Sequence, residues 1–74
     1  MPPEDDGRIR CRLTELLIDR DMTLTELAAR VDISLVNLSV LKNDRARAIR
    51  FSTLTAICDA LDCQVGELLV VDPV

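Results

Sequence analysis

The segment from Thr23 to Leu41, TLTELAARVDISLVNLSVL, constrains the fold of this chain more than any other. Leu24, Leu27 and Val31 fall on one helical face, and a new apolar pair follows a corner at residues 32–34. Two helices this short are not stable alone in water, so they must pack against the rest of the chain. Joined through so tight a corner, they predict a helix-turn-helix motif, whose second helix can lie in the major groove of DNA.

Both helices of this motif begin at a residue suited to cap their first turn. Thr23 is followed three residues later by Glu26, which is the spacing of a capping box, and predicts a helix from there to about Val31. Ser34 is the expected cap of the second helix, which we expect to end near residues 42–43. The two caps support the positions of both helices and of the corner between them.

The rest of the chain predicts one folded domain at residues 8–74, preceded by a disordered acidic tail at residues 1–7. In order along the chain, the sequence predicts a strand at 8–12, a helix at 12–20, the two helices of the motif, a basic loop at 43–50, a helix from 51 or 52 to about 61, a short helix at 65–69, and a strand at 69–71 that could face the first strand. The expected fold class is therefore all-α with five helices, to which two short terminal strands can add.

Composition supports a folded domain with an aliphatic core. Apolar residues make up 49% of the 74-residue chain, too many for a disordered protein. Phe51 is the only aromatic residue, so the core must consist mostly of Leu, Ile, Val and Ala. The same scarcity disfavours binding of RNA or single-stranded DNA, since such sites usually stack bases on several aromatic rings.

The charges are unevenly distributed along the chain. The formal net charge is −4, which by itself does not suggest a nucleic-acid ligand. Residues 34–54, however, contain Lys42, Arg45, Arg47 and Arg50 against the single acidic residue Asp44. A basic strip next to the second helix of the motif can contact phosphates while acidic surfaces elsewhere limit nonspecific binding.

The sequence offers no support for an enzyme, a metal site or a membrane protein. It has no histidine, and its three cysteines lack the spacing of a zinc site. No nucleophile has a recognisable base beside it and no glycine-rich phosphate loop occurs, so we expect no catalysis, cofactor or small-molecule ligand. Without an apolar run of about 18 residues or a signal peptide, the expected location is the cytoplasm.

Cys58 is expected in the core, and redox sensing by Cys58 with Cys63 is a weaker hypothesis.

A longer pattern carries a resemblance to a known family. It comprises Met22-Thr23, Glu26-Leu27-Ala28, Ile33-Ser34, Leu38-Ser39, Leu41, Phe51-Ser52-Thr53-Leu54 and the run from Ala60 to Leu69. In these positions the chain resembles the Xre family of phage-repressor and Cro-type helix-turn-helix regulators, in particular its minimal single-domain subgroup. The resemblance implies a small transcriptional regulator that binds double-stranded DNA sequence-specifically, with a recognition helix at about 34–42 in the major groove.

The resemblance also implies roles for individual residues and an assembly. In this interpretation Asn37 and Ser39 face bases, and Leu35 and Val36 make apolar contacts with them. The DNA backbone is held by Lys42, Asn43, Arg45 and Arg47. The predicted DNA-binding residues at the helix starts are Thr23, Thr25 and Ser34. Family members commonly bind paired half-sites as dimers. We therefore expect a homodimer, with the strands at 8–12 and 69–72 in the subunit contact.

Three positions depart from the family pattern. Asp32 stands where the turn usually has glycine, and it must adopt a left-handed conformation that Asp tolerates better than most residues. Leu24 replaces a frequent glutamine, and Leu35 with Val36 replaces polar or basic residues. The apolar pair suits either thymine methyl groups or a protein partner. The alternative function is accordingly a protein-interaction module, such as an antitoxin or a regulator subunit, with weak DNA binding.

Overall fold

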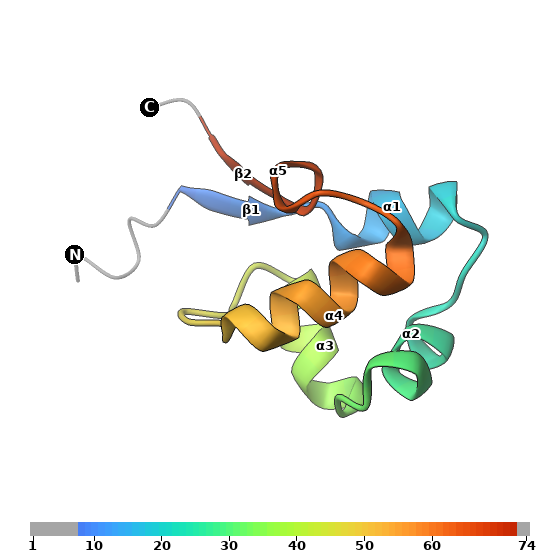
Figure 1. Ribbon diagram of the computed structural model, residues 1–74. Helices are drawn as coiled ribbons and strands as arrows, with labels where there is room; N and C mark the ends of the chain where they lie inside the picture. The colour runs from blue at the N-terminus through green and yellow to red at the C-terminus, as the bar shows by residue number, and fades with distance from the viewer. Residues whose placement is uncertain (1–7, 73–74) are drawn as a thin grey trace.

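The computed structural model describes residues 8–72, so the tail predicted at residues 1–7 lies outside the described part. The elements are β1 (Ile9–Cys11), α1 (Leu13–Asp19), α2 (Leu24–Val31), α3 (Leu35–Lys42), α4 (Phe51–Leu61), α5 (Val65–Leu68) and β2 (Leu69–Val71). In Figure 1, α4 lies between the strand pair with α5 on one side and the helices α2 and α3 on the other. The expected five-helix fold is confirmed, and so are the two terminal strands.

The ends of three elements differ slightly from the expected ones. β1 is shorter than the strand expected at 8–12, and α1 begins at Leu13. α5 ends at Leu68 rather than Leu69, because Leu69 has extended backbone angles and pairs with Cys11 in the sheet. The expected last residue of the fifth helix is therefore the first residue of β2.

The two strands form an antiparallel ribbon that joins the ends of the described chain. Ile9 pairs with Val71, and Cys11 pairs with Leu69. The ladder is extended at one end by the Arg12 amide, which donates to the Leu68 carbonyl oxygen at 2.7 Å. Since the ribbon connects the segment before α1 to the segment after α5, it closes the domain around its core.

The core is aliphatic and receives a residue from every helix. The most deeply buried side chains are Leu13, Leu27, Leu38, Ile57, Leu61 and Leu68, each at most 1% exposed. Phe51, the only aromatic residue, is 85% exposed at the start of α4. Every helix is thus held by at least one completely buried aliphatic side chain, as the composition predicts.

The predicted caps of α2 and α3 are both present. The Thr23 hydroxyl oxygen accepts a hydrogen bond from the Glu26 amide at 3.1 Å, and the Glu26 carboxylate accepts one from the Thr23 amide at 3.0 Å. The hydrogen bond from the Thr23 backbone lowers the pKa of Glu26 below its ordinary value. Ser34 caps α3 by accepting from the Asn37 amide at 3.0 Å. These bonds fix where each helix of the motif begins.

Aspartate ends each of the first four helices in a left-handed conformation. The non-glycine residues with positive φ in the range 8–72 are Asp21, Asp32, Asp44 and Asp62, with φ between 51° and 61°. Each lies at or just after the end of a helix, where glycine is usual because it has no Cβ to clash. The left-handed corner expected at Asp32 is confirmed, with φ 55° and ψ 44°.

The substitution Asp32→Ala is expected to lower the free energy of unfolding by about 1 kcal/mol. Alanine is strained in the left-handed conformation, and unlike aspartate it has no polar side chain that can form a local hydrogen bond there. Asp32→Gly is expected to be at least as stable as the natural chain, because glycine adopts this conformation without strain. Urea unfolding of the three proteins measures the order. Equal stability of the alanine variant would contradict this account of the corner.

Candidate nucleic-acid interface

The helix α3 shows an outward face made of aliphatic side chains. Leu38 and Leu41 anchor it to the core, with 1% and 6% of their surfaces exposed. On the opposite side Val36 is 71% exposed, flanked by Leu35 at 47% and Val40 at 38%. Because residues four positions apart share a helical face, Val36 and Val40 form a line along the exposed side of α3.

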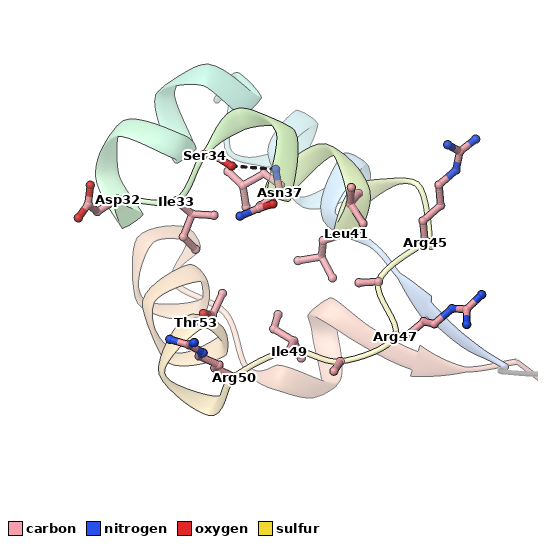
Figure 2. A pocket seen from close by; sticks show the side chains of 14 residues that line it. Asp32, Ile33, Ser34, Asn37, Leu41, Arg45, Arg47, Ile49, Arg50 and Thr53 are labelled. Atoms are coloured by element: carbon pink, nitrogen blue, oxygen red, sulfur yellow. Dashed lines mark hydrogen bonds between the residues drawn. The ribbon is translucent and has the colours of Figure 1, made fainter. Parts of the chain in front are cut away.

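The polar residues predicted to face bases lie on opposite flanks of that line. Asn37 and Ser39 are two positions apart, so their side chains point about 160° away from each other around the helix. Asn37 is exposed and turned towards a neighbouring cleft (Figure 2). Ser39 is half-buried, and its hydroxyl oxygen accepts a hydrogen bond from the Asn43 side-chain amide at 3.3 Å. The two residues predicted to face bases therefore lie on different flanks of the helix.

A cleft of about 690 Å³ separates α3 from the loop at 45–50 and the first turn of α4. Figure 2 shows Ile33, Leu41 and Ile49 directed into it, so that its floor is apolar. Its lining also includes Arg50 and Thr53 at the start of α4, on the side across from α3. The cleft thus combines an apolar floor with polar groups at its edges.

The basic loop lies beyond the C-terminal end of α3. Arg45 and Arg47 extend away from the cleft in Figure 2, into the space outside the loop. Asp44, the one carboxylate among these basic residues, accepts a hydrogen bond from the Cys11 amide at 2.7 Å. Its side chain is therefore engaged with β1, and this contact holds the loop against the strand pair. The cations at the outer surface are suited to bind an anion.

Three helix starts carry residues of interest. Thr23 and Thr25 are exposed at the beginning of α2, as the DNA-binding prediction requires. The caps at Thr23 and Ser34 already use one amide of α2 and one of α3. By contrast, α4 begins after Arg50 without a side-chain hydrogen bond to its first amides. Its first turn thus carries unsatisfied amide donors next to a cation, an arrangement that favours negative charge.

The exposure of Val40 and Phe51 was not predicted from the sequence. Val40 was not among the predicted site residues, although its position four residues after Val36 places it on the same face. The exposure of Phe51 could not be foreseen, because a lone aromatic residue is usually expected to be buried. Arg50, which the sequence places only among the basic residues of 34–54, lies at the edge of the cleft.

The three cysteines are free thiols, and two of them lie in the core. Cys58 and Cys63 are buried, and burial raises the pKa of Cys63 to about 11. Because the thiolate is the reactive form, burial and this raised pKa both disfavour reaction of Cys63. Redox sensing by Cys58 with Cys63 stays a prediction. Among residues 8–72 no helix has the length and apolar character needed to span a bilayer.

Comparisons with known proteins agree with this geometry. A family model described as Cro/C1-type HTH DNA-binding domain matches residues 12–73. The chain is 57% identical over 54 residues to an uncharacterized HTH-type transcriptional regulator, YozG, of Bacillus subtilis (strain 168), and the match covers 73% of this chain and 64% of that relative. The crystal structure of the transcriptional regulator VanUg (Form II) superimposes with a TM-score of 0.74 at 33% identity, covering 92% of this chain and 91% of VanUg.

Proposed function

The chain belongs to the family of Cro/C1-type helix-turn-helix DNA-binding domains, and from that membership we propose that it is a transcriptional regulator that binds double-stranded DNA sequence-specifically. The observation that carries this proposal is the exposure of α3. The left-handed corner at Asp32 angles this helix away from α2, and Leu38 and Leu41 bury only its inner side. The major groove of DNA is wide enough to admit an α-helix, so α3 can enter it with its exposed side towards the bases.

In this proposal α3 lies in the groove and its neighbours hold the two phosphate backbones. Leu35 and Val36 contact the groove floor, and Asn37 and Ser39 contact the groove from the two flanks of the helix. The proposed phosphate contacts come from Thr23, Thr25, Ser34, Lys42, Asn43, Arg45 and Arg47. We add Arg50 and the first amides of α4 to this set, since no side chain caps that helix. Most of the affinity then comes from phosphate contacts.

We further propose that the regulator acts as a homodimer in the cytoplasm. A single helix contacts only a few base pairs, and two-fold symmetry doubles the site with half-sites about one helical turn apart. The strand pair supports a subunit contact, since Ile9 and Val71 face each other in the register and both are exposed apolar residues. Their burial between two subunits would remove apolar surface from water.

Selection of bound duplexes from a random pool at low and moderate salt tests the proposal. With four cations per subunit contacting phosphates, a dimer is expected to lose roughly 10⁴-fold in affinity between about 50 and 200 mM salt. The recovered sequences are expected to contain two inverted half-sites about ten base pairs apart. A pool without enrichment at either salt concentration would contradict DNA binding, whereas single, unpaired sites would contradict only the dimer.

One observation favours a second candidate function, a helix-turn-helix module that binds a protein. The outward face of α3 is apolar, and the chain as a whole has a net charge of −4. A complex of this kind buries apolar surface rather than releasing counterions, so it should persist at high salt. Salt-resistant binding to a protein partner, together with failure to enrich any duplex, would make this the better account.

A further inference from the structure

We infer that the outward face of α3 recognises its DNA through the methyl groups of thymine, with Val36 and Val40 as the specificity-determining residues. The inference rests on the proposed function and adds the chemistry of the base contact to it. Val36, Val40 and Leu35 carry no hydrogen-bonding atom in their side chains, and their exposed fractions are 71%, 38% and 47%. This line cannot donate to or accept from a base edge.

The major groove offers one apolar group to such a surface. Guanine, cytosine and adenine present hydrogen-bonding atoms there, and thymine alone adds a C5-methyl group. Burying a hydrogen-bonding edge against valine would leave that edge without a partner, which is unfavourable, whereas burying a methyl group is favourable. An aliphatic face therefore selects sequences that place thymine opposite it.

The spacing of the two valines matches neighbouring thymines. Four residues of α-helix rise about 6 Å, and stacked bases along one strand are about 3.4 Å apart. Val36 and Val40 therefore lie about two base steps apart when the helix follows the groove. Leu35 adds a third exposed aliphatic group on one flank of this face, at the N-terminal end of the helix. The preferred half-site contains at least two thymines separated by one or two steps.

The surroundings of this face favour a duplex over a protein as the occupant. Lys42 and Arg45 follow directly at the C-terminal end of α3, and Arg50 lies across the cleft. The only acidic residue in residues 34–54 is Asp44, whose carboxylate is bonded to the Cys11 amide. Three partly exposed aliphatic side chains supply only part of the roughly 800 Å² per partner that a specific protein interface needs. An apolar strip bordered by cations matches methyl groups bordered by phosphates.

Replacement of thymine by uracil removes the methyl group and nothing else from the base edge. The probes are two alternating A·T duplexes of about 30 base pairs, one with thymine and one with uracil on both strands. At low salt the natural protein is expected to bind the thymine duplex about 15-fold more tightly per half-site, at about fourfold for each of two buried methyl groups. The double variant Val36→Ala, Val40→Ala is expected to bind both duplexes with equal, weaker affinity.

Ile18→Ala is the control, because Ile18 is aliphatic and about as exposed as Val36, at 75% and 71%, but lies on α1. This variant is expected to keep the full preference for thymine. Circular dichroism confirms that each variant is folded, which is expected since all three residues are exposed. Equal binding of the two duplexes by the natural protein would overturn the inference and leave the proposed function intact. Failure to bind any duplex at low salt would overturn both.

Discussion

Replacing Leu38 with alanine is expected to lower the free energy of unfolding by about 3–5 kcal/mol, the usual range for a leucine truncated in a well-packed core. Leu38 is completely buried, and with Leu41 it is one of only two buried residues that attach α3 to the domain. A domain this small has few other contacts with which to fill the cavity. The loss is therefore a large part of its total stability.

Val36→Ala is the matched control for this substitution. It removes aliphatic volume from the same helix, but from a side chain that is mostly exposed to water. Its effect on stability is expected to stay within about 0.5 kcal/mol. Thermal unfolding separates the two, because each kcal/mol shifts the Tm of a domain of this size by about 4–8 °C. Similar Tm values for both variants would mean that α3 is not anchored as described.

The double substitution Lys42→Gln, Arg45→Gln is expected to weaken DNA binding, and the loss of affinity per subunit is expected to be about 60-fold larger at 0.1 M salt than at 1 M salt. Each lost phosphate contact reduces the slope of log affinity against log salt by about 0.9, so the slope is expected to flatten by about 1.8 per subunit. Fluorescence anisotropy with a labelled duplex over a series of salt concentrations measures both quantities. Folding is expected to be unaffected, because Arg45 is exposed and Lys42 only half-buried.

Arg10→Gln with Arg12→Gln provides the control for net charge. These residues belong to β1 and the residue after it, and each pairs with a carboxylate, Asp72 and Glu15 respectively. The overall charge changes by the same amount as in the Lys42 and Arg45 variant. The slope is expected to stay near that of the natural protein, since these cations lie outside the surface proposed to contact DNA. Because the strand pair is also the proposed subunit contact, light scattering is used to check that this variant keeps the oligomeric state of the natural protein. An equal flattening in both variants would show that only total charge matters, and would remove Lys42 and Arg45 from the interface.

Local patterns identified the helix-turn-helix motif because its signals are short-range. The capping box of Thr23 and Glu26, the cap at Ser34 and the spacing of Leu38 and Leu41 all involve residues within one or two helical turns. Such contacts form in the same way in any chain with those residues at that spacing. The left-handed corner at Asp32 belongs to the same class, since its conformation depends on a single residue.

Contacts between distant segments could not be derived in this way. Arg20 is an example, because its Nε donates to the Leu61 carbonyl oxygen at 2.7 Å and its Nη2 to the Asp62 carbonyl oxygen at 3.2 Å. Nothing in the sequence distinguishes Arg20 from the other arginines, whereas in the structure its side chain donates to backbone carbonyl oxygens at the end of α4. Asp44 likewise turns from an acidic residue in a basic loop into an acceptor for the Cys11 amide.

The sequence alone determined the fold class, the position of α3 and the aliphatic character of the core, because periodicity, caps and composition act over a few residues or over the whole chain. The spacing of Leu38 and Leu41 also predicted the buried side of α3, and only the tertiary structure decided what the two flanks of its exposed side meet. The docking of Leu38 and Leu41 rotates the helix so that Val36 and Val40 point outward, while Asn37 borders the cleft and Ser39 bonds to Asn43. The physical reason is that a helix is oriented by what packs against it, and those partners come from segments far away in the chain.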